Sequence, residues 1–267
     1  MLPPFYTKAL AAIASVDQNW TYIPEMTLTV AGLLSDSRFP LHWDMSRTER
    51  LTLITLLDQL RPELSLEVGT YKGGSLQVLS HFSERVISVD VRPEVPIELD
   101  GRFDNVKFRT GDSRKVLPSV VHELNERRET PGFILIDGAH DTPGVRSDIE
   151  TVLRFDVRND VVVLMHDSFN PECRQGMREA DWASSPHVHE VELDFVPGNL
   201  SPDGGDKKWA NMMWAGFGCA IMRPEPRSGS LQIRETFKPT FEAVFRISAH
   251  ARKSGWQSLF RPSQASP

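Results

Sequence analysis

The stretch Glu67 to Ser75, which reads Glu-Val-Gly-Thr-Tyr-Lys-Gly-Gly-Ser, constrains the fold of this chain more than any other feature. It overlaps the end of an apolar run over residues 64–68 and opens a segment with helical apolar spacing over residues 75–82. This order predicts a buried strand, then a glycine-rich turn, then the start of a helix. Glycines let the backbone pass close to a ligand and adopt positive φ values. A plain tight turn without a ligand is the alternative.

The spacing within this turn favours one kind of ligand. Glu-x-Gly-x-x-x-Gly-Gly-Ser differs from the Gly-x-Gly-x-x-Gly of dinucleotide-binding turns. A helix start offers unpaired N–H groups to a carboxylate, and an acid two residues before the first glycine suits an ammonium group. S-adenosylmethionine carries both groups, so we predict that the turn binds it. The predicted contacts are Glu67, Gly69, Thr70, Gly73, Gly74 and Ser75.

Strands and helices alternate through the middle of the chain. Strands are predicted at residues 63–68, 85–90, 106–110, 132–137 and 161–165, with helices between them. Continuous apolar strands that alternate with helices indicate an α/β fold with a doubly wound parallel sheet, covered on both faces. Two closing strands, at 188–195 and 215–222, predict an antiparallel addition at the edge of the sheet. Ser46 and Glu49 are spaced as a capping box that starts the helix before the first strand.

The segments outside this alternation are predicted to be accessory. Residues 1–45 are expected to form a lid or an oligomerisation segment, residues 46–222 the main domain, and residues 223–267 a helical extension. Within the main domain, residues 197–214 are the candidate substrate lid because they begin rich in Gly, Pro and Asp. The apolar N-terminal segment predicts a homo-oligomer.

Charge and composition exclude several classes of partner. The net charge is −6 and the pI about 5.8, which argues against a protein that grips a nucleic-acid backbone. The sequence contains no apolar run of membrane-spanning length, and its first residues predict a helix rather than a secretory signal. Cys173 and Cys219 are too few for a disulfide framework or a structural zinc site. We therefore predict a cytoplasmic protein that binds neither nucleic acid nor membranes.

Acidic residues stand at or just beyond the ends of four predicted strands: Asp90, Asp112, Asp137 and Asp167. Ligands of doubly wound sheets bind outside the carboxyl ends of the strands. Asp90 is placed to accept the hydroxyls of a ribose, and Asp112, with Ser113, to hold the edge of an adenine. These residues are also typical turn formers and helix caps, and the two kinds of role can coexist.

The ends of the fourth and fifth strands carry the predicted chemistry. Asp137 and Asp167 would lie within reach of one hard cation such as Mg²⁺, which lowers the pKa of a bound hydroxyl. His140, one turn beyond Asp137, is the predicted general base. The alternatives are that His140 braces the next helix and that His166 stabilises the strand end. A zinc site of His140, His166 and Asp137 is a further alternative, without familiar ligand spacing.

Three motifs together resemble the class I S-adenosylmethionine-dependent methyltransferases, over about residues 46–222. They are the glycine turn, Ile-Asp-Gly-Ala-His at residues 136–140 and Met-His-Asp at residues 165–167. They are most similar to small-molecule O-methyltransferases, a group that includes the macrolide-sugar O-methyltransferases and cephalosporin-hydroxylase-like proteins. The resemblance implies a Rossmann-like seven-stranded sheet, mostly parallel with the last strand antiparallel, and helices on both faces. It also implies a methyl donor over Glu67, Gly69 and Asp90, with Asp112 near the adenine.

The resemblance further implies a set of catalytic groups. Asp137, His166 and Asp167 match the positions of the metal ligands, and His140 matches the position of the base. His166 stands where those enzymes tend to have an acidic or amide residue, which leaves room for a softer metal than Mg²⁺ or for none. The expected activity is methylation of a hydroxyl on a sugar or another natural product. A metal-independent methyltransferase, a non-catalytic cofactor-binding protein and a nicotinamide oxidoreductase are the alternatives.

Overall fold

The computed structural model describes residues 38–201 and 210–252 of the chain. Every element below belongs to one compact unit, Leu41–Pro267. Most of the predicted N-terminal segment, the middle of the candidate lid and the end of the C-terminal extension lie outside the described residues. Within the described ranges no helix has the length and apolar character needed to cross a membrane.

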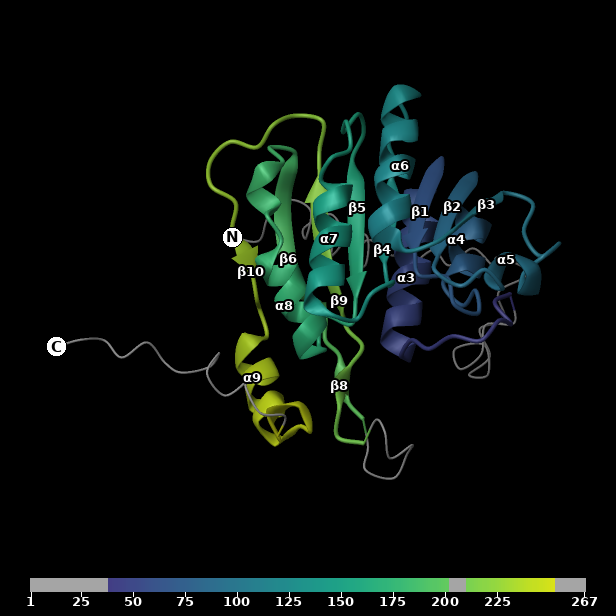
Figure 1. Cartoon of the computed structure of the whole chain (residues 1–267). Helices are drawn as coiled ribbons and strands as arrows, with labels where there is room; N and C mark the ends of the chain where they lie inside the picture. Colours follow the sequence, from purple (N-terminus) through teal and green to yellow (C-terminus); the bar gives the residue numbers. More distant parts are fainter. Residues whose placement is uncertain (1–37, 202–209, 253–267) are drawn as a thin grey trace, which may run out of the picture. The chain divides into compact units, whose positions relative to one another are not determined.

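An eight-stranded sheet forms the centre of the unit, in the order β10-β6-β9-β5-β4-β1-β2-β3 (Figure 1). Its strands are β1 (Leu64–Val68), β2 (Arg85–Asp90), β3 (Val106–Thr110), β4 (Phe133–Ile136), β5 (Val161–His166), β6 (Val188–Val196), β9 (Phe217–Met222) and β10 (Ile233–Arg234). Strand β9 runs antiparallel to both of its neighbours, β5 and β6, and all other pairs are parallel. The predicted α/β fold class is thus confirmed. The eighth strand is the two-residue β10, which is too short to leave an apolar pattern in the sequence.

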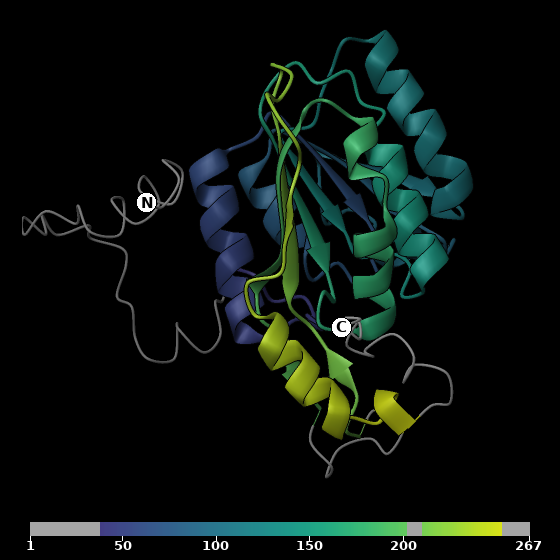
Figure 2. The same cartoon turned by 90° about the vertical axis from the view of Figure 1, so that its left-hand side faces the viewer.

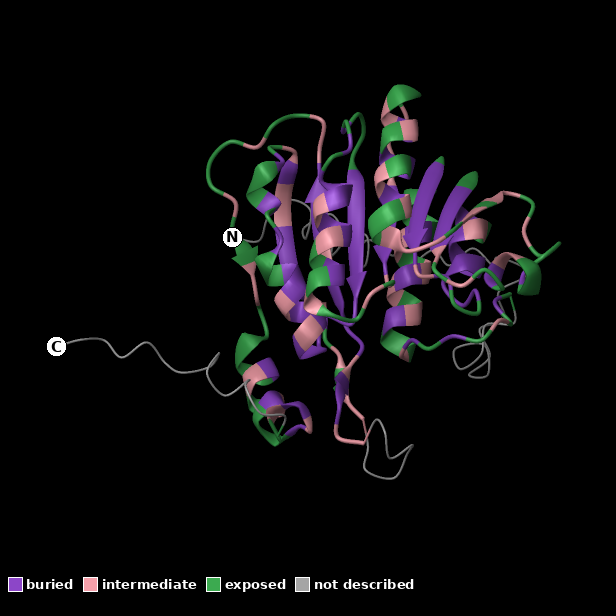
Figure 3. Ribbon diagram, viewed as in Figure 1, coloured by how far each residue is buried: buried purple, intermediate pink, exposed green. Residues whose placement is uncertain are grey.

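Helices cover both faces of the sheet. They are α3 (Arg47–Leu60), α4 (Leu76–Phe82), α5 (Val95–Glu98), α6 (Ser113–Glu126), α7 (Thr142–Val152), α8 (Pro171–Glu179) and α9 (Lys238–Ile247). Figure 2 shows α3 on one side of the sheet and α6, α7 and α8 on the other. This arrangement explains why β1, β4 and β5 are buried at every position, while β3 at the edge is partly exposed (Figure 3).

Polar side chains cap the start of four helices, α3, α6, α7 and α8. The capping box at the start of α3 is present as predicted, with Ser46 and Glu49 bonded to each other's backbone N–H. Asp112 caps α6, Asp141 caps α7 and Asn170 caps α8. Because three of these helices begin soon after β3, β4 and β5, their capped ends gather beside the strand ends.

A small hairpin and the last helix adjoin this edge. The hairpin pairs β7 (Asn199–Leu200) with β8 (Met213–Trp214). An apolar cluster joins the hairpin to α9, and its buried members are Phe169, Met213, Phe241 and Phe245. In Figure 1, β8 and α9 lie beyond the end of β5. The described part of the candidate lid is therefore packed against the C-terminal extension.

A buried ion-pair network fixes the C-terminal extension to the sheet. The Arg174 side chain is 2% exposed, lies 2.7 Å from Asp194 and 3.0 Å from Glu235, and stacks over the ring of Phe241. The backbone N–H of Phe237 donates to the same Asp194 carboxylate. The start of α9 is held by these contacts.

Candidate functional site

The glycine-turn region, which we define as Gly69 to Ser75 together with Asp90, is built mainly from backbone. Gly69 has a φ of 93°, and a Cβ atom there would lie 2.0 Å from the carbonyl oxygen of Asp137. Its N–H donates to Val89 O at 2.8 Å. Glycine is therefore required at this position because the turn after β1 presses against the end of β4.

Asp90 shapes the turn from the neighbouring strand. Its Oδ2 accepts the N–H groups of Thr70 at 2.9 Å and Tyr71 at 2.8 Å, and its Oδ1 accepts the N–H of Arg92 at 2.8 Å. The structure thus shows the turn-forming role. A carboxylate has about four acceptor sites, so Asp90 retains capacity for the predicted ribose hydroxyl.

Glu67 lies beneath the turn rather than on its surface. Its side chain is buried, and it accepts hydrogen bonds from Ser75 Oγ at 2.5 Å and Ser88 Oγ at 2.7 Å. Burial raises the pKa of Glu67 to about 7. The structure places Glu67 where it holds Ser75 and the helix start in position. Its predicted contact with an ammonium group stays a prediction.

Asp112 and Ser113 stand at the start of α6, beyond β3. Asp112 caps the helix through the N–H of Arg114 at 3.0 Å, and its carboxylate forms two more hydrogen bonds with the Arg114 guanidinium. The structure shows the capping role of Asp112. The predicted contact with an adenine is not tested by these bonds.

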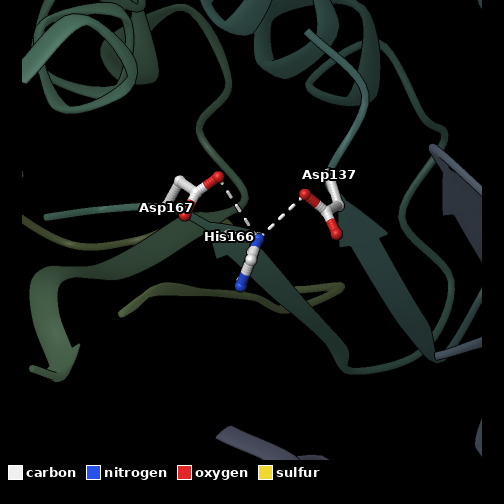
Figure 4. A group of neighbouring side chains, drawn as sticks. All are labelled: Asp137, His166 and Asp167. Carbon is white, nitrogen blue, oxygen red and sulfur yellow. Dashed lines mark hydrogen bonds and ion pairs between the residues drawn. The ribbon is translucent and has the colours of Figure 1, made fainter. Parts of the chain in front are cut away.

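A second group of side chains, the acid–histidine cluster, consists of Glu49, Asp137, His140, His166 and Asp167. His166 Nδ1 lies 2.9 Å from Asp137 Oδ1 and 3.5 Å from Asp167 Oδ2 (Figure 4). His140 Nε2 lies 3.1 Å from Asp167 Oδ2 and 3.7 Å from Asp137 Oδ1. The structure therefore brings together all four residues that the sequence proposes for metal binding and proton transfer.

The register of the sheet explains this convergence. Strands β4 and β5 are parallel neighbours, with Ile136 paired to Met165. The residues that follow this pair therefore leave the sheet side by side. Asp167 adopts a left-handed backbone with a φ of 57°, which is uncommon for a residue other than glycine. Its N-terminal neighbour, His166, is the last residue of β5.

The charges of the cluster depend on one another. Although burial opposes it, the positive charge of His166 and hydrogen bonds with both histidines lower the pKa of Asp137 to about 2. Burial lowers the pKa of His166, but the negative charges of Asp137 and Asp167 outweigh this effect and hold the pKa well above its usual range. Hydrogen bonds with Asp137 and Asp167 raise the pKa of His140 to about 10. Both histidines are therefore protonated at neutral pH when the two carboxylates have no other cation.

The donor set fits a divalent cation. One ligand atom from each of Asp137, His166 and Asp167 lies within 4.8 Å of the others. Two carboxylates and one imidazole suit Mn²⁺ and other borderline metals as well as Mg²⁺. The ligands are also held from outside, because the N–H of Ala215 donates to Asp167 Oδ1 at 2.7 Å. Such outer contacts are typical of metal sites.

Two members of this site escape prediction from the sequence. Glu49 is recognised there only as half of a capping box, yet its Oε1 lies 2.9 Å from His166 Nε2. Trp214 is predicted only as the last residue of the candidate lid, yet its ring meets the imidazole of His140 edge-on, with 5.8 Å between the ring centroids. No local pattern marks either contact, because the residues involved are far apart in the sequence.

Comparisons with known proteins agree with this architecture. A family model described as a methyltransferase domain matches residues 66–168, a span that includes the glycine-turn region and all of the acid–histidine cluster except Glu49. A search of curated proteins finds no match.

Several solved structures are similar to this chain at low sequence identity. The cofactor-bound protein Rv0187 from MTB has a TM-score of 0.50 and 17% identity, covering 84% of this chain and 99% of that one. An O-methyltransferase from Bacillus cereus in complex with SAH has a TM-score of 0.49 and 20% identity, covering 76% and 94%. The O-methyltransferase TomG from Streptomyces achromogenes, involved in tomaymycin synthesis and in complex with SAM, has a TM-score of 0.49 and 15% identity, covering 84% and 100%.

Residues 66–168 of this chain are similar to a methyltransferase domain, and they lie within a mostly parallel sheet covered by helices on both faces.

Proposed function

We propose that the protein is an O-methyltransferase that acts on a hydroxyl of a small molecule, a sugar or another natural product, with the help of a divalent metal. One observation carries the proposal: the glycine turn and the acid–histidine cluster adjoin. Gly69 packs directly against the backbone of Asp137, whose side chain belongs to the cluster. A methyl donor on the turn would therefore place its reactive end beside two carboxylates and two imidazoles.

Different residues of the chain have different roles in the proposed reaction. Bound S-adenosylmethionine supplies a methyl group on a sulfonium, which is already electrophilic. Asp90 and the helix start after Ser75 orient the donor, and Trp214 shields the neighbourhood of His140. With the charges of Asp137 and Asp167 neutralised by a cation, His140 would be neutral, and its Nε2 would accept the proton of the acceptor hydroxyl while the hydroxyl oxygen bonds to the methyl carbon and the bond from carbon to sulfur breaks. The protein contributes mainly by positioning and desolvation.

The support for a metal in this scheme is the set of three possible ligand residues in the cluster. A divalent cation held by Asp137, His166 and Asp167 would supply a Lewis acid that lowers the pKa of the acceptor hydroxyl. His140 is about half exposed, so it faces the space that an acceptor would enter.

A metal-independent reaction is the second candidate. His140 Nε2 lies 3.1 Å from Asp167 Oδ2, so the carboxylate could orient the imidazole without a cation. Because the two carboxylates then raise the pKa of His140 to about 10, His140 must lose its proton before it can act as the base, and turnover in this scheme rises with pH. Treatment with a chelator separates the two schemes. Only the metal-assisted enzyme loses turnover, and added Mg²⁺ or Mn²⁺ restores it.

The proposal is tested by replacing His140. Turnover is measured as release of S-adenosylhomocysteine on a panel of sugar and phenolic hydroxyls. His140→Asn is expected to lower turnover by about 10²-fold or more, because a general base typically contributes that much. Binding of S-adenosylhomocysteine, measured by calorimetry, should change by less than about threefold. His122→Asn, on the exposed face of α6, is the matched control.

Three results would contradict parts of the proposal. Full turnover in His140→Asn would remove His140 as the base. Binding of S-adenosylhomocysteine without turnover on any acceptor would favour a non-catalytic cofactor-binding protein. A wild-type protein that does not bind S-adenosylhomocysteine would refute the predicted donor site.

A further inference from the structure

Glu49 is buried to an extent that its role in the capping box does not explain. Its side chain is 0% exposed, whereas glutamate is almost never fully buried unless it is paired. A capping box needs only one carboxylate oxygen, and Oε2 fills that role by accepting the Ser46 N–H at 2.6 Å. The other oxygen, Oε1, points into the acid–histidine cluster.

Oε1 meets two groups that belong to the ends of other strands. It lies 2.9 Å from His166 Nε2, at the end of β5. It also accepts the N–H of Gly216 at 2.6 Å, just before β9. Gly216 follows Ala215, whose N–H donates to Asp167 Oδ1 at 2.7 Å. Glu49 Oε1 therefore contacts His166 directly. It also binds the turn at Gly216, whose neighbour Ala215 holds Asp167.

The two nitrogens of His166 face opposite partners. Nε2 lies 2.9 Å from Glu49 Oε1 as an ion pair, without the alignment of a hydrogen bond, and Nδ1 lies 2.9 Å from Asp137 Oδ1 and 3.5 Å from Asp167 Oδ2. A cation held by Asp137 and Asp167 would replace the proton on Nδ1, and the carboxylate of Glu49 would then favour the remaining proton of the ring on Nε2. Helix α3 supports this arrangement, because its N-terminus favours a negative charge at Glu49.

We propose that Glu49 is the positioning residue of the metal site. It keeps the proton of His166 on Nε2, directs the lone pair of Nδ1 between Asp137 and Asp167, and fixes the turn at Gly216 that orients Asp167. The ligands in question are divalent cations that accept mixed oxygen and nitrogen donors, such as Mn²⁺. This proposal rests on the metal-assisted form of the proposed function.

The turn at Gly216 is closely packed, so a change at Glu49 would reach Asp167 through it. Gly216 has a φ of 87°, and a Cβ atom there would lie 2.8 Å from Gly198 N and 2.9 Å from Ser168 Oγ. Ala215 also has a positive φ, of 64°. Two successive left-handed residues make a tight turn whose N–H groups point at Glu49 and Asp167. Loss of the Glu49 contact would leave the Gly216 N–H unpaired in a buried place.

Replacing Glu49 and Ser46 separately distinguishes the two roles of the carboxylate. Glu49→Gln weakens the contact with His166, whereas Ser46→Ala removes the other half of the capping box and leaves Oε1 in place. Binding of Mn²⁺ is measured by calorimetry on the full chain, and thermal unfolding and S-adenosylhomocysteine binding are measured beside it. Glu49→Gln is expected to weaken Mn²⁺ binding by about 10- to 100-fold. Ser46→Ala should lower the unfolding temperature but change Mn²⁺ affinity by less than about twofold.

A second variant covers the case in which Glu49→Gln does not fold. Glu49→Asp keeps the charge but draws the carboxylate back by one methylene, and it should weaken Mn²⁺ binding by about tenfold. Binding of S-adenosylhomocysteine should be the same as in the wild type for all three variants.

The failures are distinguishable. Equal Mn²⁺ affinity in the Glu49 variants and the wild type would overturn the positioning role and leave the proposed function intact. An equal loss in Ser46→Ala would assign the effect to the helix start instead. A wild-type protein that binds S-adenosylhomocysteine but not Mn²⁺ would overturn the positioning role and metal assistance together. A wild-type protein that binds neither would overturn the donor site as well.

Discussion

The glycine-turn region and the acid–histidine cluster lie next to each other but are built in different ways. The turn is held through its own backbone N–H groups, as in the bonds from Thr70 and Tyr71 to the side chain of Asp90 at the end of the next strand. The cluster is assembled from side chains of α3, β5 and the loops after β4 and β5. Its longest link, from Gly216 to Glu49, joins residues 167 positions apart. The glycine-turn region is thus formed by residues close in the sequence, whereas the acid–histidine cluster forms only when distant parts of the chain have folded together.

This difference implies different tolerance to change. Backbone-built sites fail when the path of the chain is altered, and side-chain-built sites fail when one partner is removed and another is left buried without it. Substitutions in the turn, in the ion-pair network of Arg174 and at the buried Glu67 measure this difference.

The largest effect is expected at Gly69. Gly69→Ala places a methyl group 2.0 Å from the Asp137 carbonyl oxygen, so the turn and the end of β4 must separate. We expect a loss of more than about 4 kcal/mol in the free energy of unfolding, and loss of S-adenosylhomocysteine binding. Denaturant unfolding and calorimetry provide the measurements.

Gly229 offers a matched control. It has the same φ of 93°, but a Cβ atom there would have nothing within 4 Å. Gly229→Ala should therefore cost only the strain of a left-handed residue, about 1 kcal/mol. Equal losses in the two variants would show that strain, and not the contact between the turn and β4, limits the choice of residue.

The next largest effect is expected at Arg174. Arg174→Met leaves Asp194 and Glu235 without their shared cation in a buried place. We expect a loss of about 3–5 kcal/mol and faster hydrogen exchange over residues 233–252. Arg178→Met is the control, because Arg178 is 43% exposed and lies 3.7 Å from Glu235. A loss of less than about 1 kcal/mol in Arg174→Met would mean that apolar packing alone holds α9.

The smallest effect is expected at Glu67, and it depends on pH. The folded pKa of about 7 lies above the ordinary value of 4.5, so the folded state binds this proton more tightly than the unfolded state does. The contribution of Glu67 to stability is then fully present below pH 4.5 and is lost as the pH rises through about 7. Glu67→Gln removes this dependence. It should gain up to about 3 kcal/mol relative to the wild type between pH 5 and pH 8.

Thermal unfolding of both proteins across this range checks the prediction. Glu84→Gln, at an exposed position, should give a curve parallel to that of the wild type. A Glu67→Gln curve that is also parallel would show that Glu67 is ionised at little cost beneath the turn.

Much of the fold could be predicted because its signals are local. Apolar runs marked β1 to β5, and Ser46 and Glu49 marked the start of α3. One predicted boundary is wrong, and its cause also lies in a few neighbouring residues. The last long strand is predicted from residue 215 but begins at Phe217, since Ala215 and Gly216 form the left-handed turn.

The site could be predicted only in part. Asp137, His140, His166 and Asp167 follow adjacent strands, so the parallel order of the sheet was enough to bring them together. The place of Glu49 depends on how α3 packs on the sheet, which no motif encodes. The strand β10 likewise depends on contacts made by Arg234 with Glu190 and Glu192, since its two residues carry no pattern of their own.

The shared carboxylate of Glu49 has a consequence for the motion of the protein. The first turn of α3 cannot fray without withdrawing the partner of His166 Nε2 and of the Gly216 N–H. Local opening of this turn and disassembly of the cluster are therefore one event with one free energy. Amide exchange in the first turn of α3 reports how often the cluster comes apart.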